Sequence, residues 1–261
     1  MFDEDLFKSK LNTRWLGHSL VYFEQVDSTN SYIRSLSSDN AGHGLVCLTD
    51  YQTQGRGQYK RRWMTEPGAN LTFTLNFKPN KADRLHVLTL ACALAASELA
   101  EEVTGQPSRL KWPNDIFAAG KKLGGLLTET IFTGSVLNRV MVGIGLNVNQ
   151  RRFTPPLDAT ATSLSVLDGQ LTFQREIVLA HLLERIEVLY QNWQRVSVDL
   201  VKNINRRLLG YGEWVQLQVD GRLKPGRSKF LGINEKGQMV VLTQDDEVET
   251  YSYEQIRILI D

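Results

Sequence analysis

The spacing of apolar and polar residues divides the chain into short extended segments and two long helical ones. Apolar runs or alternation, which are typical of β-strands, occur in four segments: residues 20–26, 44–49, 70–77 and 140–148. The third segment carries its apolar side chains on one face: Leu71, Phe73, Leu75 and Phe77. Two longer segments favour helices: residues 85–103, rich in alanine and leucine, and residues 174–208, with a break expected near 196–198.

Capping and turn residues refine this outline. Residues 27–30 read Asp-Ser-Thr-Asn, which are types that cap helix N-termini, so a helix is predicted through residues 32–36. A hairpin is predicted between residues 109–117 and 122–132, with its turn at residues 118–121. Such a hairpin would place Asp115 close to Lys122 across the turn.

The long helical pattern ends before Gly-Tyr-Gly at residues 210–212. Short alternating segments follow, with turn sequences at residues 220–221 and 235–237, and this pattern suits a small β-barrel. We therefore predict an α+β protein with two domains, residues 1–208 and residues 209–261.

Composition narrows the range of functions. Of the 261 residues 42% are hydrophobic, which suits a globular core, and the net charge of +1 gives no long-range attraction to nucleic acid or anionic lipid. Residues 1–15 lack the features of a signal peptide, and no apolar run reaches the ~18 residues of a membrane span. We therefore expect a cytoplasmic protein with no membrane partner.

Cysteine and histidine usage gives no sign of a metal site. Cys47 and Cys92 form no CxxC pair, and we expect both to be buried free thiols. The four histidines show no metal-ligand spacing.

A basic segment at residues 52–62 is the first candidate for chemistry. Two glycines, Gly55 and Gly57, lie at its start, and four cationic residues lie within seven positions: Arg56, Lys60, Arg61 and Arg62. Glycine lets backbone N–H groups turn towards an anion, arginine adds bidentate contacts to phosphate or carboxylate, and Trp63 could stack on a base. The segment is neither a Walker loop nor a GxGxxG fingerprint. A solvated loop, a nucleotide-phosphate site and a nucleic-acid contact remain open from composition alone.

Residues 111–115 (Lys-Trp-Pro-Asn-Asp) and 120–125 (Gly-Lys-Lys-Leu-Gly-Gly) form the second candidate. Lys122 could neutralise a substrate carboxylate or charge developing on phosphate, and Asp115 could accept a proton from an attacking amine. The alternative is a surface salt bridge beside a turn.

A third segment, residues 143–149, contains glycines inside a strand, which indicates close approach of a ligand or, more simply, tight packing against a helix.

In this order the segments resemble the biotin–protein ligase family from about Leu20 onward. The resemblance is carried by Ser-Thr-Asn at residues 28–30, Gly-Arg-Gly at 55–57 with Trp63, Gly-Ala-Asn-Leu at 68–71, Lys-Trp-Pro-Asn-Asp at 111–115, Lys-Leu-Gly-Gly at 122–125 and the segment 143–149. It implies a class II synthetase-like mixed β-sheet flanked by helices, followed by an SH3-like β-barrel. The implied activity uses Mg-ATP to convert biotin to biotinyl-5'-AMP, and then transfers biotin to a lysine of a biotin carboxyl carrier protein or domain.

The resemblance also implies roles for matching positions. Catalysis would involve Lys122, Arg56 and Asp115. Biotin binding would involve Ser28, Thr29, Asn30, Gln52, Gly55, Arg56, Lys122, Gly124 and Gly125. Nucleotide binding would involve Arg56, Gly57, Arg61, Trp63, Asn70, Lys122 and Asn147. Mg²⁺ would be carried with ATP, near Asn70, without a protein cage.

Two departures from the family pattern bear on function. Bacterial relatives usually read GRGRxGR, whereas Gln58 and Lys60 here replace the second arginine and the third glycine, so we expect weaker retention of the adenylate. Only 27 residues precede Ser28, too few for the winged helix-turn-helix of repressor relatives, so we expect no operator DNA partner.

Other functions remain as alternatives. A lipoate–protein ligase or acyltransferase could share the scaffold, and a biotin-sensing binding protein could share the pocket without turnover. The presence of Lys122 and Asp115 argues against a sensor without turnover. The near-neutral net charge of the chain argues against an RNA contact. Both a monomer and a homodimer are compatible with the sequence.

Overall fold

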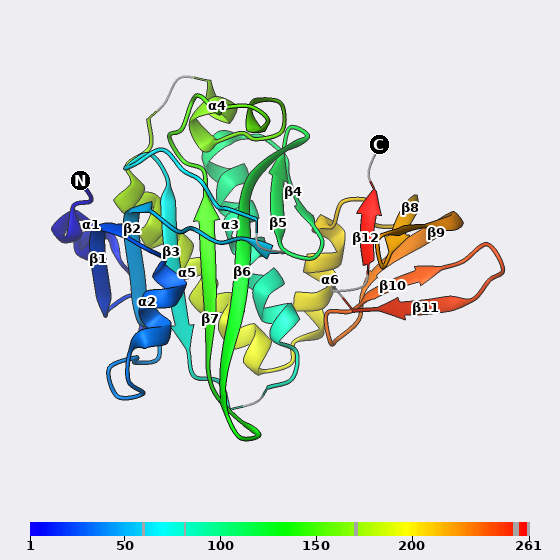
Figure 1. The fold of residues 1–261 in the computed structure, drawn as a ribbon, viewed down its shortest axis with the longest axis horizontal. Helices are drawn as coiled ribbons and strands as arrows, with labels where there is room; N and C mark the ends of the chain where they lie inside the picture. Colours follow the sequence, from blue (N-terminus) through cyan, green and yellow to red (C-terminus); the bar gives the residue numbers. More distant parts are fainter. Residues whose placement is uncertain (59–60, 81, 170–171, 253–255, 260–261) are drawn as a thin grey trace.

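The computed structural model describes residues 1–58, 61–80, 82–169, 172–252 and 256–259. They form a large sheet flanked by helices and a small sheet at the C-terminal end (Figure 1). The helices are α1 (Glu4–Lys10), α2 (Thr29–Ser35), α3 (Leu85–Thr104), the short 3-10 turn η2 (Leu157–Ala159), α4 (Leu164–Asp168), α5 (Arg175–Gln194) and α6 (Val198–Arg207). The strands are β1 (Leu20–Val26), β2 (Val46–Gln52), β3 (Leu71–Phe77), β4 (Ser108–Lys111), β5 (Asp115–Ala118), β6 (Lys121–Thr133), β7 (Val136–Leu146), β8 (Trp214–Val219), β9 (Arg222–Ile233), β10 (Met239–Leu242), β11 (Val248–Tyr251) and β12 (Ile256–Leu259).

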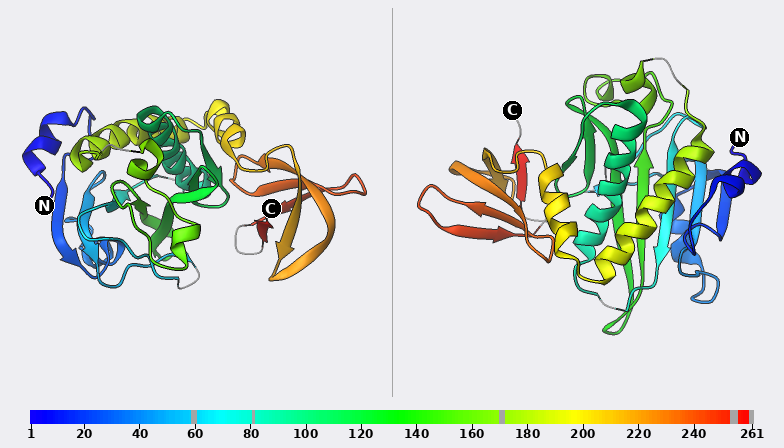
Figure 2. Two further views of the ribbon diagram at one scale, coloured as in Figure 1. Left: turned by 90° about the horizontal axis from the view of Figure 1, so that it is seen from above. Right: turned by 180° about the vertical axis from the view of Figure 1, so that it is seen from behind.

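The large sheet has the strand order β1-β2-β3-β7-β6-β5-β4. β1 and β2 are parallel and the other neighbouring pairs are antiparallel, so the predicted mixed sheet is confirmed. α3 and α5 cover one face of the sheet, and α2 lies on the opposite face (Figure 2). Apolar side chains of α3, α5 and the sheet form one continuous core, whose removal from water is the main force that holds these layers together.

Strand β3 lies inside the large sheet, between β2 and β7, and is buried along its whole length. Its apolar face joins the core shared with α3 and α5, as the alternation predicts: Leu71, Phe73, Leu75 and Phe77. Its other face carries Thr72, Thr74 and Asn76, which are also buried. Buried polar groups cost free energy unless they are hydrogen-bonded. This second face therefore requires polar partners from whatever covers it.

Most predicted elements form within a few residues of their expected bounds, with two corrections. Helix α2 begins at Thr29, earlier than predicted, because Ser28 is its N-cap and the Ser28 side chain accepts a hydrogen bond from Ser31 N. Residues 109–117 are not one strand: β4 ends at Lys111 and β5 begins at Asp115. Pro113 lies between them, and a proline has no N–H to continue a strand ladder.

The predicted hairpin turn and helix break are both confirmed. β5 and β6 pair as an antiparallel hairpin, with Ala119 and Gly120 at positive φ in the turn. The long helical segment divides into α5 and α6, and Val196 between them also has positive φ.

The C-terminal strands form a five-stranded antiparallel sheet in the order β11-β10-β9-β8-β12, as expected for an SH3-like barrel. Its β9–β10 turn contacts the main body of the protein. Arg84 Nε donates to the carbonyl oxygen of Glu235 at 2.8 Å, and Trp112 Nε1 donates to that of Gly237 at 3.3 Å. The small sheet is thus attached to the start of α3 and to the turn after β4. The domain division at residues 208 and 209 stays a prediction.

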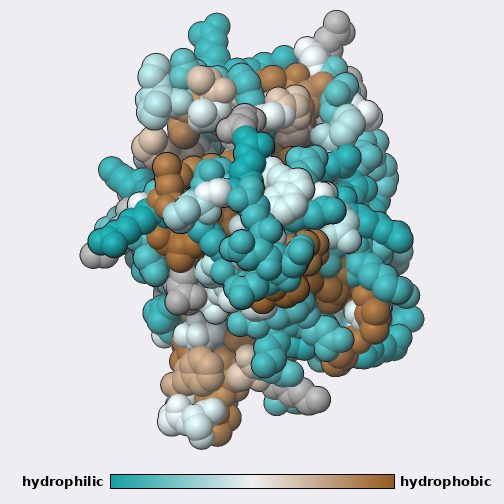
Figure 3. All heavy atoms as spheres, turned by 90° about the vertical axis from the view of Figure 1, so that its right-hand side faces the viewer, coloured by the Kyte–Doolittle hydropathy of each residue, from teal (hydrophilic) through white to brown (hydrophobic). Residues whose placement is uncertain are grey.

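The surface around the C-terminal sheet is mostly hydrophilic, with separate apolar patches (Figure 3). Exposed apolar side chains of this sheet include Trp214, Leu223 and Val248. Scattered apolar residues of this kind are normal on protein surfaces. None of the described helices is both long and apolar enough to cross a membrane.

Both cysteines are free and buried, as predicted. Burial in apolar surroundings raises the pKa of Cys47 and that of Cys92 to about 12. Because the thiolate is the reactive form of cysteine, the native protein should not react with DTNB at pH 8, whereas both thiols should react after unfolding in guanidinium chloride. The absorbance of released thionitrobenzoate counts them, and Cys47→Ala should lose one equivalent from the unfolded count. Rapid labelling of the native protein would contradict this prediction.

Candidate active site

Small residues form a shallow floor on the face of the large sheet that carries α2. Five residues stand opposite one another on neighbouring strands, and we call them the floor row: Thr49, Thr72, Gly145, Gly125 and Asp115. Directly opposed residues project to the same face of a sheet, so the row runs across five strands on one surface. The two glycines leave room above the sheet for other groups to approach the backbone closely.

Side chains from two other segments occupy the space above the glycines. A Cβ at Gly145 would overlap the indole of Trp63, and a Cβ at Gly143, two residues earlier on β7, would overlap the side-chain amide of Asn30. The sequence left two explanations for these glycines, helix packing and close approach of a ligand. Gly143 accommodates Asn30 of α2, as helix packing requires, while Gly145 accommodates the basic segment.

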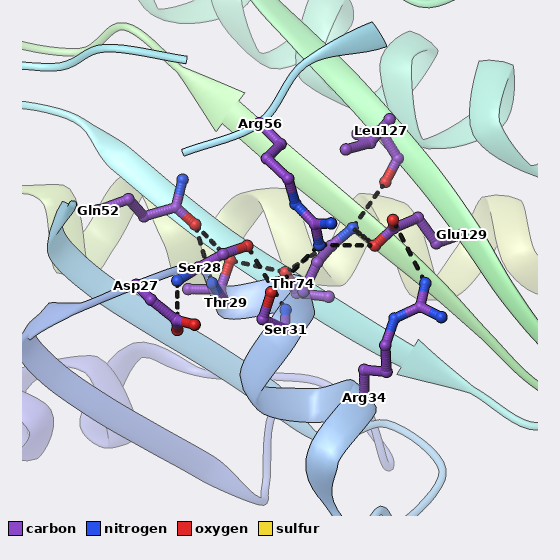
Figure 4. Close-up of polar contacts among 11 residues, drawn as sticks. Asp27, Ser28, Thr29, Ser31, Arg34, Gln52, Arg56, Thr74, Leu127 and Glu129 are labelled. Atoms are coloured by element: carbon purple, nitrogen blue, oxygen red, sulfur yellow. Dashed lines mark hydrogen bonds and ion pairs between the residues drawn. The ribbon is translucent and has the colours of Figure 1, made fainter. Parts of the chain in front are cut away.

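The N-terminal end of α2 carries a polar cluster beside this floor (Figure 4). Thr29 donates to Gln52 Oε1 through its backbone N at 2.8 Å and through its hydroxyl at 3.2 Å. Thr74 Oγ1 lies 2.7 Å from Thr29 Oγ1 and 2.6 Å from Asn30 Oδ1. The structure therefore brings together Thr29, Asn30 and Gln52, three of the residues assigned to biotin, with Ser28 as the helix cap.

Glu129 on β6 contacts both this cluster and Arg56 of the basic segment. Its carboxylate accepts from Asn30 Nδ2 at 2.8 Å and forms ion pairs with Arg34 at 3.3 Å and Arg56 at 3.5 Å (Figure 4). Arg56 also donates to Ser31 Oγ at 3.1 Å. Neither Glu129 nor Thr74 was expected at the site from the sequence. The signal for Thr74 was the polar half of an alternating strand whose apolar half was recognised.

Lys122 and Asp115 form the predicted pair across the β5–β6 hairpin. Lys122 Nζ lies 2.6 Å from Asp115 Oδ1, and both side chains are partly exposed. A Cβ at Gly125 would lie 3.1 Å from Lys122 Nζ, so the amine sits at the end of the floor row. The backbone of Lys122 is fixed by hydrogen bonds to Thr160 and Thr162.

The described part of the basic loop, residues 53–58 and 61–63, folds back on itself above the floor. Trp63 N donates to the carbonyl oxygen of Gly55 at 3.0 Å, and Gly57 N donates to that of Arg61 at 2.7 Å. A Cβ at Gly55 would overlap the carbonyl oxygen of Trp63, so glycine is required there for the loop to close. Lys60, one of the two residues that depart from the GRGRxGR pattern, lies outside the described residues.

Asn70 and Asn147, assigned to the nucleotide, are buried and shape the loops that flank the floor. Asn70 Oδ1 accepts from Val148 N at 2.9 Å, and its Nδ2 donates to Gln150 Oε1 at 2.6 Å. Asn147 Nδ2 donates to the carbonyl oxygen of Thr162 at 2.9 Å. These contacts explain both residues structurally, and their roles towards a nucleotide stay predictions.

A buried ion pair missed by sequence analysis supports this side of the site. Arg175 Nη1, at the start of α5, lies 2.6 Å from Asp50 Oδ1 and donates to the carbonyl oxygen of Asn70 at 3.2 Å. Asp50 Oδ2 accepts from the hydroxyl of Tyr22 at 2.7 Å. Burial, together with the carboxylate of Asp50, raises the pKa of Tyr22 to about 12, so this hydroxyl stays a donor at neutral pH.

The residues present do not fit a Mg²⁺ ion held by the protein. Among the described residues there is no group of three His, Cys, Asp or Glu side chains placed to bind a metal. Asn70, the predicted neighbour of the ion, has both ends of its amide engaged within the protein.

A cavity of about 710 Å³ adjoins the cluster, between β6, the first turn of α3 and the β9–β10 turn of the small sheet. Arg56, Gly57 and Gln58 line it. Trp63 and Lys122 are not among its described lining residues. The indole of Trp63 lies over Gly145 of the floor row, and Lys122 contacts Asp115 at the end of that row. Arg56 instead contacts Ser31 and Glu129 beside the polar cluster, so the three residues do not surround a single cavity.

Comparisons with known proteins show which family the chain resembles. Residues 22–147 match the model of the Biotin/lipoate A/B protein ligase family. The bifunctional ligase/repressor BirA of Bacillus subtilis is 32% identical over 246 residues, covering 93% of this chain and 75% of the relative. The biotin–[acetyl-CoA-carboxylase] ligase of Mycobacterium tuberculosis is 28% identical over 85% of this chain and 86% of its own.

A solved structure extends the likeness to the whole fold. The biotin protein ligase from Aquifex aeolicus, in complex with biotin and ATP, superposes with a TM-score of 0.78 at 30% identity, covering 93% of this chain and 100% of the other. The match spans both the helix-flanked sheet and most of the C-terminal sheet. On these grounds the chain belongs to the biotin–protein ligases of the biotin/lipoate A/B protein ligase family.

Proposed function

We propose that this chain is an ATP-dependent biotin–protein ligase. In the first step a carboxylate oxygen of biotin attacks the α-phosphorus of ATP, which forms biotinyl-5'-AMP and releases pyrophosphate. In the second step the amine of a lysine on a biotin carboxyl carrier protein attacks the acyl carbon, which forms an amide and releases AMP. The relatives that the chain matches over most of its length are named as biotin ligases, which favours this activity over a lipoate ligase or a sensor without turnover.

One observation carries the assignment of the site. The floor row has Lys122 at one end, while the polar cluster of Thr29, Asn30 and Gln52 lies beside the other. A ligand with a carboxylate at one end and a polar ring at the other suits this arrangement. Biotin has this shape, with a ureido ring joined by an alkyl chain to its carboxylate.

In the first step the residues must bring two anions together. Lys122 would move its ammonium from Asp115 to the biotin carboxylate and then to the charge that develops on the α-phosphate. Arg56, which Glu129 holds beside the cluster, would turn towards the adenylate with Gly57 and Arg61. Trp63 would pack against the adenylate once the basic loop has reclosed. Closure would keep water from the mixed anhydride, which hydrolyses readily.

In the second step Asp115 would receive or orient the proton of the incoming amine. A free lysine has a reference pKa of about 10.4, so the acceptor is mostly protonated near pH 7 and requires a base. The ion pair explains how Asp115 is released for this role. When Lys122 contacts the acyl-phosphate, the carboxylate of Asp115 loses its partner and can bind the acceptor amine.

Mg²⁺ would accompany ATP as part of the substrate, and its charge would offset that of the phosphates. The protein's own residues would then bind the nucleotide through N–H groups and cations of the basic loop. The carrier protein is expected to present a single lysine near Asp115.

The decisive experiment incubates the protein with biotin, ATP labelled at the α-phosphate and Mg²⁺. Formation of labelled biotinyl-AMP with release of pyrophosphate is expected. Lipoate replaces biotin in a parallel reaction. Product from lipoate alone would establish the lipoate ligase, and biotin binding without pyrophosphate release would establish the sensor.

Separate assays of the two steps test Lys122 and Asp115. Lys122→Ala should reduce biotinyl-AMP formation about 100-fold or more, because it removes the cation that offsets charge on the carboxylate and phosphate. Asp115→Ala should form biotinyl-AMP but transfer it slowly to the carrier. Lys121→Ala, which removes a neighbouring lysine on the same strand, is the matched control and should behave as wild type. Undiminished adenylate formation by Lys122→Ala would refute the assignment of Lys122.

The departure at Gln58 predicts how tightly the intermediate is held. Gln58→Arg should slow dissociation of biotinyl-AMP roughly tenfold, since a charged multidentate donor is added where the loop meets the ligand. Gln54→Arg adds the same charge elsewhere on the loop and should change little. Release of purified labelled intermediate, followed by filtration, gives the rates, and equal rates for wild type and Gln58→Arg would reject the prediction.

A further inference from the structure

The hydroxyl of Thr72 is buried in the floor row without a hydrogen-bond partner. Thr72 is only 4% exposed, and no atom among the described residues is positioned to bond its Oγ1. A buried hydroxyl that gives up water without gaining a partner destabilises the fold. Groups of this kind are few in native proteins and call for an explanation.

The neighbouring threonines show that the strands themselves do not cause this. Thr49, directly opposite Thr72 on β2, donates its hydroxyl to the carbonyl oxygen of Tyr51 at 3.0 Å. Thr74, two residues along β3, bonds to Thr29 and Asn30. Of these three threonines, Thr72 alone lacks a partner among the described residues. Asn76 Oδ1, four residues further along β3, has none there either, but it lies outside the floor row.

A second buried donor without a partner lies beside it. The indole of Trp63 covers Gly145, which is opposite Thr72 on β7, and among the described residues nothing bonds Trp63 Nε1. One donor belongs to the rigid sheet and the other to the basic loop. Two such atoms at one point of the floor indicate that a polar group of a ligand belongs between them.

We propose that Thr72 is a specificity-determining residue whose hydroxyl binds the ureido ring of biotin. The assignment rests on the proposed function. Thr72 lies in the half of the floor row away from Lys122, between Thr49 and Gly145. It is two residues before Thr74, which bonds Thr29 of the cluster. A biotin whose carboxylate reaches Lys122 would extend over Gly125 and Gly145, which places its ring above Thr72.

The chemistry of the two rings explains why this contact discriminates. A ureido group offers one carbonyl acceptor and two N–H donors, and a threonine hydroxyl can pair with either kind. The dithiolane ring of lipoate has no comparable group and would leave the hydroxyl unpaired. Sites built to hydrogen-bond a substrate reject analogues that lack the partner, because the buried polar group is then left unsatisfied.

Entry of the ring requires Trp63 to leave Gly145. A backbone hydrogen bond joins Trp63 N to the carbonyl oxygen of Gly55. Once the indole of Trp63 has moved off Gly145, its Nε1 is free to bond the ring beside Thr72. Thr72 itself is fixed by the sheet and needs no rearrangement.

Thr72→Val tests the inference because it keeps the shape of the side chain and removes the hydroxyl. Calorimetric titration with biotin, without ATP, should show about tenfold weaker binding, since the ureido group loses one partner. Binding of lipoic acid should not weaken. The melting temperature of the unliganded protein should rise, because the unsatisfied group is gone. Loss of affinity together with a gain in stability is an outcome that a purely structural threonine would not give.

Thr104→Val, at the C-terminal end of α3 on the opposite face of the sheet, is the matched control. Its hydroxyl donates to the carbonyl oxygen of Ala100 at 2.6 Å, so this variant should melt at a lower temperature and bind biotin as wild type does. Thr72→Ser restores the hydroxyl and should recover most of the affinity. Thr72→Ala removes it again and should bind as weakly as Thr72→Val, which provides a second test of the same loss.

The outcomes separate the two proposals. A folded Thr72→Val protein with wild-type affinity for biotin and an unchanged preference over lipoic acid would overturn the role of Thr72 alone. A wild-type protein that binds no biotin would overturn the proposed function, and the role of Thr72 with it.

Discussion

The buried polar face of strand β3 constrains the structure around it. The opposite face of this strand is committed to the core beneath α3 and α5, so β3 cannot turn its threonines towards water. Burial of these side chains is tolerable only where something polar covers them. The N-terminal end of α2 supplies such groups to Thr74, and its hydrogen bonds with Thr29 and Asn30 fix the helix over the sheet. Beyond the reach of α2, the floor is left to the basic loop and to a ligand.

Two cations of the site, Lys122 and Arg56, form ion pairs with carboxylates of the protein. Lys122 contacts Asp115, and Arg56 contacts Glu129. Both pairs are partly exposed, so each is weak enough to be exchanged for a substrate anion at little cost. The pair of Arg175 with Asp50 is different because both side chains are nearly buried. Breaking it would leave an uncompensated charge in the interior, so it serves as a fixed support for the loop around Asn70.

Local sequence was sufficient for most of the fold because each element has its own pattern. Alternation located β3, capping residues located α2, and the glycine turn located the hairpin that joins Lys122 to Asp115. The same reasoning failed at residues 109–117, where the apolar pattern outweighed Pro113. Reasoning from the sequence also assigned no role to the polar face of β3. A sequence does not show whether the second face of a strand is exposed to solvent or covered by another layer.

The sequence by itself determined the order of the elements, the local hairpin and the motifs that identify the family, because these depend on neighbours along the chain. Only the tertiary structure decided which distant residues share a surface. Thr72, Gly145, Gly125 and Asp115 come from four strands, and their alignment in one row is set by strand register. Glu129 reaches Arg56 and Asn30 for the same reason. Register follows from the packing of the whole sheet against its helices, a cooperative property that no single segment of the chain encodes.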